Sequence, residues 1–320
     1  MNRPFSIYLD LVRFVAAFLV YIYHSNQRHL VADPLPVSNF GHSSVIVFFV
    51  LSGFVIAYIT DTKERDWATY TASRISRVYS VAVPALMLTL VLDGIGRQLY
   101  PAIYVYPFDQ FLVRLTSSLL MLNEVWFVSI TAFSNVPYWS ICYELWYYVG
   151  FGLLMFLPRR VGWGLLGAVT LLLGPKILLL APIWVAGVLL YRWQRLKTMS
   201  LGVALLLVVL SSVGVIAFHM LEVDMRITAV FKALIGEYWH TQLTFSKFFV
   251  SDYLLAALVF ANFAGMRQVA PVLAPLFMRI ERPVRFLATY SFTLYLLHQP
   301  LFLFFTALLR GDPEGYGYWL

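Results

Sequence analysis

Residues 5–24 read FSIYLDLVRFVAAFLVYIYH, and within this apolar segment only Asp10 and Arg13 carry a formal charge. An α-helix rises about 1.5 Å per residue, so about 20 apolar residues cross the roughly 30 Å hydrocarbon core of a bilayer. No small-residue cleavage site of the kind that ends a signal peptide follows the segment. The segment therefore predicts a retained first transmembrane helix.

The composition of the whole chain agrees with a membrane protein. Of its 320 residues 61% are hydrophobic and 12% are charged, and the mean hydropathy is +0.76. A soluble domain usually has about twice that charged share and needs it to cover its surface. The composition thus excludes a soluble globular protein and a disordered chain. The sparse net charge of +7 gives no nucleic-acid patch, and the single Cys142, expected to be a packing residue, excludes an intrachain disulfide.

Apolar segments of spanning length recur along the chain, which predicts an all-α, polytopic membrane helical bundle of about ten transmembrane helices, within a range of nine to eleven. The segment 161–191 is interrupted by Gly174-Pro175-Lys176 and predicts two short helices, 161–174 and 177–191. The segment 110–131 carries Arg114, Asn123 and Glu124, and its spanning, interfacial and re-entrant readings stay open. We expect one membrane-embedded domain over residues 1–320, without a soluble domain. The other expected spans are 5–24, 43–60, 79–96, 139–157, 200–219, 248–266 and 284–308.

The distribution of Lys and Arg predicts a cytoplasmic N-terminus. Cytoplasmic loops of membrane proteins are enriched in these residues. Placing Arg3 in the cytoplasm also places the basic loop 61–78 there. The basic loop 267–285 joins the same side if 110–131 does not cross, and the later loops invert if it does.

The first helix carries three ionisable groups, which are costly within a bilayer and therefore candidates for function. Asp10 lies three residues before Arg13, in position to pair with it. Arg13 and His24 are 11 residues apart, hence about 20° apart around the helix and about 16 Å apart along it. A structural ion pair with an interfacial histidine is the alternative to a functional site.

Three further motifs place polar groups in or beside apolar segments. Ser52 and Gly53 lie within the motif VFFVLSGF of residues 47–54 and favour close helix packing. Arg74 and Arg77 lie on one helix face, where they form either a fork for phosphate oxygens or a cytoplasmic anchor. Glu144 lies inside the apolar segment that begins at Trp139-Ser140, where a carboxylate is costly unless it is paired or used.

The last apolar segment places Ser291, Tyr295 and His298 on one helical stripe. This stripe is either part of a site or a hydrogen-bonding seam between helices. The other histidines show no metal-ligand spacing, so no metal site is expected; they are His29, His42, His219 and His240.

Taken in order, these motifs resemble those of the acyltransferase-3 family of integral membrane O-acyltransferases. Asp10-Leu11-Val12-Arg13, followed by His24, resembles the family's first-helix signature. The resemblance continues through 48–54, Arg74-x-x-Arg77, Trp139-Ser140 with Glu144, and 291–300, and so covers nearly the whole chain.

This resemblance implies transfer of an acyl group, most often acetyl, from cytoplasmic acyl-CoA to a hydroxyl of a glycan or lipid-linked sugar. His24 would be the general base, with Asp10, Arg13 and Glu144 as the other catalytic residues; direct transfer and an acyl-histidine intermediate both remain open. Glu144 would orient His24 or the acceptor. The donor-binding set would be Ser52, Arg74, Arg77, Tyr295 and His298.

The expected partners are acyl-CoA as donor substrate, the acceptor and membrane lipids, without a tightly bound cofactor or nucleic acid. The resemblance points to a bacterial inner membrane. Acceptor selection would lie in the outward loops 25–42 and 220–247. Acceptor identity, acyl chain length and oligomeric state stay open.

Two other classes of protein remain as alternatives. A secondary transporter or flippase also uses intramembrane ionisable residues and interrupted helices such as 161–191. No matching interruption lies in a corresponding half of the chain, which disfavours an inverted repeat. A non-catalytic membrane scaffold would not require His24.

Overall fold

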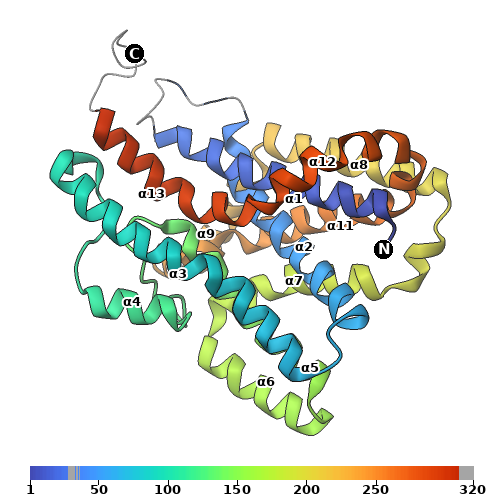
Figure 1. The fold of residues 1–320 in the computed structure, drawn as a ribbon, viewed down its shortest axis with the longest axis horizontal. Coiled ribbons are helices and arrows are strands. Elements are labelled where there is room, and N and C mark those ends of the chain that lie inside the picture. The colour runs from blue at the N-terminus through green and yellow to red at the C-terminus, as the bar shows by residue number, and fades with distance from the viewer. Residues whose placement is uncertain (28–32, 34, 36, 310–320) are drawn as a thin grey trace.

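The computed structural model describes residues 1–27, 33, 35 and 37–309 (Figure 1). Within these residues the regular structure is helical, apart from an isolated β-bridge between Ala132 and Asn135, which confirms the predicted all-α class. The α-helices of the described chain are α1 (Arg3–Tyr23), α2 (Gly41–Thr62), α3 (Trp67–Leu99), α4 (Phe111–Leu119), α5 (Trp139–Phe156), α6 (Arg159–Leu173), α7 (Pro175–Arg192), α8 (Leu201–Met220), α9 (Val223–Ile235), α10 (Glu237–Gln242), α11 (Phe249–Val272), α12 (Ala274–Thr289) and α13 (Ser291–Leu309).

Seven helical segments of the described chain are long and apolar enough to cross a membrane. They contain α1, α2, α3, α7, α8, α11 and α13. The predicted break within 161–191 is confirmed, because α6 ends at Leu173 and α7 begins at Pro175 after Gly174, whose φ is 75°. The expected number of about ten spans stays a prediction.

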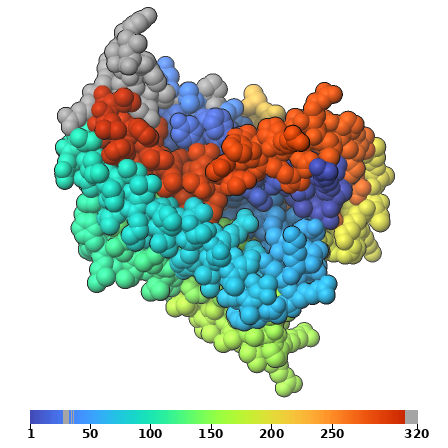
Figure 2. Space-filling model, in the orientation of Figure 1, coloured from blue at the N-terminus to red at the C-terminus, as the bar shows by residue number. Residues whose placement is uncertain are grey.

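Exposed apolar side chains cover the outer helices, as lipid contact requires. Along α8, large aliphatic side chains such as Leu206, Val209, Leu210 and Val213 are each more than half exposed. α6 projects at the lower edge of the molecule in Figures 1 and 2 and likewise exposes Trp163 and other apolar residues. A soluble monomer rarely exposes such continuous apolar surface.

α3 begins 12 residues before the span expected at 79–96, because a side chain caps it. Asp66 Oδ1 accepts a hydrogen bond from the backbone N–H of Thr69 at 2.8 Å. This bond satisfies one of the free N–H groups at the helix start. It also lowers the pKa of the Asp66 carboxyl, because it stabilises the charged form.

The span expected at 284–308 is not one continuous helix, although α13 is itself long and apolar enough to cross a membrane. α12 ends at Thr289, Tyr290 interrupts the helix, and α13 begins at Ser291. α12 packs along α1, and the two helices α12 and α13 follow one another across the face shown in Figure 2. The apolar pattern gave no sign of this break, because residues 288–292 are compatible with a helix.

Two segments expected to be irregular or ambiguous also take definite forms. In 110–131 the helix α4 has nine residues, about 13 Å by its rise, so this segment does not cross a bilayer as a helix. The expected outward loop 220–247 is mostly helical, since it contains α9 and α10. Part of the expected loop 25–42, namely residues 28–32, 34 and 36, lies outside the described residues.

Helices α2 and α7 approach each other closely at two glycines. A Cβ atom built on Gly53 would lie 2.0 Å from the backbone oxygen of Trp184. One built on Gly187 would lie 2.0 Å from the backbone oxygen of Val50. The packing role expected for Gly53 is therefore confirmed, and the contact fixes Ser52 beside α7.

Replacing Gly53 by alanine is expected to lower the stability of the detergent-solubilised protein by about 1–3 kcal/mol or more, because backbone atoms of α7 must move. Gly164→Ala is the matched control, since a Cβ at Gly164 meets nothing within 4 Å and alanine favours a helix. Thermal unfolding of both variants measures the difference. Equal melting temperatures for Gly53→Ala and Gly164→Ala would contradict the close contact.

Candidate active site

Asp10 is held between two arginines from different helices. Arg13 Nη1 lies 3.3 Å from Asp10 Oδ1, and Arg285 Nη1 of α12 lies 2.7 Å from Asp10 Oδ2. The expected pairing of Asp10 with Arg13 is therefore present. Arg285 is a partner that the sequence did not reveal, because it lies 275 residues away.

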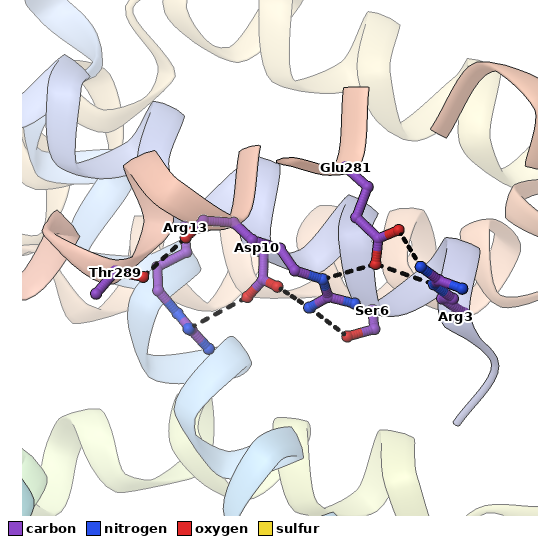
Figure 3. A network of polar contacts seen from close by, with 7 residues as sticks. Arg3, Ser6, Asp10, Arg13, Glu281 and Thr289 are labelled. Atoms are coloured by element: carbon purple, nitrogen blue, oxygen red, sulfur yellow. Dashed lines mark hydrogen bonds and ion pairs between the residues drawn. The ribbon is translucent and has the colours of Figure 1, made fainter. Parts of the chain in front are cut away.

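This pair extends into a charged network along α1 (Figure 3). Glu281 accepts hydrogen bonds from Arg285 Nε at 2.9 Å and from Arg3 Nε at 3.0 Å. Charges of opposite sign thus alternate from the start of α1 to Arg13, with Asp10 and Glu281 between the arginines. The network fixes α12 on α1 and sets the position of Arg13.

Arg13 lines a partly open cavity between helices, with an empty volume of about 790 Å³ that includes open solvent. Helices α1, α2, α3, α5 and α13 line it, so segments far apart in the sequence meet there. Among its lining residues are six of the expected site residues, namely Arg13, Ser52, Arg74, Arg77, Glu144 and Tyr295.

Glu144 belongs to a hydrogen-bonded group in the wall of this cavity. Its Oε1 accepts from the Ser52 and Tyr148 hydroxyls, each at 2.5 Å. Trp184 Nε1 of α7 donates to Ser52 Oγ at 3.1 Å. The expected orientation of His24 by Glu144 does not match this arrangement, since the hydrogen bonds that Glu144 makes within the described chain are to these two hydroxyls.

The two arginines of the expected phosphate fork have different surroundings. Arg74 is buried, and its Nη2 lies 2.5 Å from Glu64 Oε1. Its guanidinium also lies 5.6 Å from the ring centroids of both Tyr70 and Tyr148. Arg77 is exposed, lines the cavity, and has no ion-pair or hydrogen-bond partner for its guanidinium among the residues described. Arg77 is therefore the guanidinium available to an anionic ligand.

His24 lies in a 3₁₀ turn, His24–Gln27, at the far end of α1 from Arg3, and it is buried. Its ring centroid is 4.7 Å from that of His298 on α13. Its Nδ1 lies 3.0 Å from the Gln27 side-chain nitrogen Nε2, which donates to it in this orientation of the amide; with the amide rotated, Nδ1–H would instead donate to the Gln27 carbonyl. His298, expected with the donor-binding residues, lies instead beside His24.

Tyr295 connects the cavity with the two histidines. It lines the cavity, and its hydroxyl lies 2.7 Å from Ser140 Oγ. Its ring centroid is 6.2 Å from that of His298, which in turn contacts His24. The expected stripe of α13 therefore runs from the cavity to His24.

A second buried ion pair lies outside the cavity lining. Lys176 Nζ at the start of α7 is 2.7 Å from Glu124 Oε2, and both side chains are at most 1% exposed. Lys176 also donates to the backbone oxygen of Val128, and Ser129 Oγ donates to Glu124 at 2.6 Å. This pair anchors the segment after α4. Within the described residues, no three His, Cys, Asp or Glu side chains lie close enough together to hold a metal ion.

Some site residues could have been found from sequence and others not. Tyr148 follows Glu144 by four residues, a spacing that places both on one helix face. Arg285 and Trp184 had no local signal, because each reaches its partner only through the packing of distant helices. Gln27 lies in the expected acceptor loop 25–42 and gave no motif of its own.

Comparison with known proteins assigns the chain to a family. A family model described as an acyltransferase domain matches residues 6–320, so the chain belongs to the acyltransferase-3 family. Acyltransferase MdmB of Streptomyces mycarofaciens is 28% identical over 159 residues, which are 47% of this chain and 39% of that relative. The alignment thus spans less than half of that curated protein. No solved structure matches.

Family membership and the seven apolar helices of the described chain together indicate an integral membrane protein of the acyltransferase-3 family. The expected family is therefore confirmed. The donor, the acceptor, the base and the orientation in the membrane are matters of proposal.

Proposed function

We propose that the protein is an acyl-CoA-dependent O-acyltransferase that moves an acyl group, acetyl by preference, to a hydroxyl of a glycan or lipid-linked sugar. The observation that carries the proposal is the cavity in which Arg13, Arg74 and Arg77 meet. Coenzyme A carries several phosphates, and guanidinium groups bind phosphate oxygens through charge-assisted hydrogen bonds. The unpaired Arg77 would make the first phosphate contact, with Arg74 behind it.

The reaction needs a base for the acceptor hydroxyl, whose pKa lies far above neutrality. In the proposed step the hydroxyl oxygen attacks the thioester carbonyl carbon while His24 takes its proton. The carbon–sulfur bond then breaks, and the proton passes to the leaving thiolate of coenzyme A. For this role the Gln27 amide is rotated about its terminal bond, so that His24 Nδ1 carries a proton and donates to the Gln27 carbonyl, which leaves Nε2 free to accept. Gln27 is thus a positioning residue.

The bound acyl-CoA would extend from the arginines to His24 along the polar stripe of α13. Arg13 and His24 are about 16 Å apart along α1 by helix rise. The phosphates would stay at Arg77 while the thioester reaches the neighbourhood of Tyr295 and the histidine pair. Ser52 and Glu144 would line this path, and Asp10 would hold Arg13 beside it.

The basic N-terminal end of α1 is proposed to face the cytoplasm of a bacterial inner membrane. Arg3 and the segment 61–78, which includes the start of α3, are rich in Lys and Arg, as cytoplasmic segments usually are. α12 contacts the start of α1 through Glu281 and Arg3, and α13 contacts His24 at the other end of α1. The two helices together would therefore cross the membrane once. Adding α5 and α6 to the seven apolar helices gives nine passages, the lower limit of the expected range.

The proposal predicts that acetyl-CoA stabilises the detergent-purified protein, by about 2.7 kcal/mol at a hundredfold excess over Kd. Arg77→Ala should lose most of this stabilisation, because a hydrogen bond to a charged group contributes about 1.5–3 kcal/mol. Thermal unfolding with a panel of acyl-CoAs is the measurement. Arg160→Ala, an exposed arginine at the start of α6, is the matched control.

Absence of stabilisation by any acyl-CoA, from a well-folded wild-type protein, would contradict the donor assignment and favour a transporter. Equal loss in Arg77→Ala and Arg160→Ala would show that the cavity does not bind the phosphates.

A further inference from the structure

A group of uncharged polar side chains lies beside the histidine pair. The Gln299 amide Nε2 on α13 lies 2.7 Å from the Tyr106 hydroxyl, and the Gln27 amide Nε2 lies 3.5 Å from the same hydroxyl. Gln27 also contacts His24, and His298 lies against His24. Five side chains from three distant segments thus converge beside the proposed base.

Three of these side chains keep a buried polar atom without a hydrogen-bond partner in the described chain. These atoms are Gln27 Oε1, Gln299 Oε1 and His298 Nε2. Gln299 and His298 are nearly fully buried, at 0% and 3% exposure. The His298 Nδ1 lies 3.2 Å from the backbone oxygen of Leu294, so its proton is used there and Nε2 is left as an acceptor.

The unpaired atoms cannot be satisfied from within the group. Tyr106 has one hydroxyl proton, which serves at most one of the two glutamine carbonyls. Rotating the Gln27 amide so that its carbonyl accepts from His24 leaves its NH₂ unpaired in place of its oxygen. An unpaired buried polar group is costly, which favours a ligand that pairs it.

The position of Tyr106 is set by the surrounding fold. The Arg97 guanidinium of α3 donates to the backbone oxygens of Tyr104 and Tyr106. Tyr104 and Ile103 also pack against Leu303 of α13 in one buried cluster. The polar group is therefore formed in advance of any ligand, and the nearby Arg97 charge is directed at backbone carbonyls.

We infer that Gln27, Tyr106, His298 and Gln299 form the subsite for the acceptor, and that the acceptor is a neutral polyol with neighbouring hydroxyls, such as a sugar ring. A hydroxyl both donates and accepts, so it pairs with carbonyl oxygens, with the His298 nitrogen and with the Gln27 amide in either orientation. A carboxylate or phosphate only accepts and would leave the two oxygens and the nitrogen unpaired. The inference rests on the proposed function, because it places the acceptor next to His24.

The test is the rate of CoA release from acetyl-CoA by the purified full chain, with methyl glucoside, methyl galactoside, methyl mannoside and glycerol as probes. At least one polyol should accelerate release with saturation, and 1-propanol should not. Gln299→Leu should raise the half-saturating polyol concentration at least about tenfold, about 1.4 kcal/mol. Its stabilisation by acetyl-CoA should stay as in the wild type.

Gln268→Leu is the matched control, because the Gln268 amide donates to the backbone oxygens of Leu196 and Lys197, away from the histidines. It should behave as the wild type with each polyol. A polyol response unchanged in Gln299→Leu would overturn the subsite, as would acetyl-CoA binding and hydrolysis without any polyol response. Absence of acetyl-CoA binding would instead overturn the proposed function itself. If Gln299→Leu does not fold, Tyr106→Phe should raise the same concentration, and an unchanged value would overturn the subsite.

Discussion

Replacing His24 by alanine is expected to lower the rate of acyl transfer by about 10²–10⁴-fold, the usual contribution of a general base. In this account the neighbouring His298 binds the acceptor hydroxyl through Nε2, with its Nδ1 3.2 Å from the Leu294 backbone oxygen, and does not remove the proton. The buried turn around His24 should otherwise persist, since Ser25 Oγ still accepts from the Leu35 backbone N–H. The measurement is CoA release in the presence of a working acceptor.

His219→Ala is the matched control for this substitution. His219 is also buried and hydrogen-bonded, with its Nε2 2.9 Å from Ser43 Oγ, but it does not contact the cavity or His24. Its activity should stay within about threefold of the wild type, less than about 0.7 kcal/mol in the barrier. Equal losses in the two variants, or a His24→Ala loss below tenfold, would remove His24 from the mechanism.

Replacing Lys176 by methionine is expected to destabilise the protein by about 3–5 kcal/mol, because it leaves the Glu124 carboxylate buried without its partner. The cost should be large here, since both side chains of the pair are almost fully buried. Unfolding in detergent, followed by denaturant or heat, measures the loss. The segment after α4, which Glu124 anchors, should become accessible to protease first.

The double variant Lys176→Met/Glu124→Leu separates a lost charge partner from lost packing. Apolar side chains of similar volume often replace a buried ion pair without cost. The double variant should therefore recover most of the stability that Lys176→Met loses. A double variant less stable than the single one would show that the pair contributes through its other hydrogen bonds.

The local features of the fold were predictable from sequence, because each depends on neighbouring residues. The first helix, the break before Pro175 and the Asp10–Arg13 pair follow from hydropathy, glycine conformation and helical spacing. The gathering of Arg13, Arg74, Arg77 and Glu144 was predictable only through the family resemblance, since it requires the packing of three helices, α1, α3 and α5.

The features of the fold and site that the sequence did not reveal depend on tertiary contacts. The break at Tyr290 has no glycine or proline at the junction, and it becomes visible only once α12 packs along α1. His298 shares a stripe with Tyr295, which suggested the donor site, but the length of α13 carries it onward to His24. Glu144 was expected to orient His24 or the acceptor. Its carboxylate instead accepts hydrogen bonds from Ser52 and Tyr148 in the wall of the cavity, and the Ser52 contact forms only when α2 packs against α5.

The most direct test of a donor cavity separate from the base is acetyl-CoA binding to the wild type, His24→Ala and Arg77→Ala, measured in parallel on detergent-purified protein. The account predicts that His24→Ala binds acetyl-CoA with the affinity of the wild type although transfer is lost. It predicts that Arg77→Ala binds at least about tenfold more weakly, which corresponds to about 1.4 kcal/mol. Wild-type affinity in Arg77→Ala, or an equal loss of affinity in His24→Ala, would contradict it.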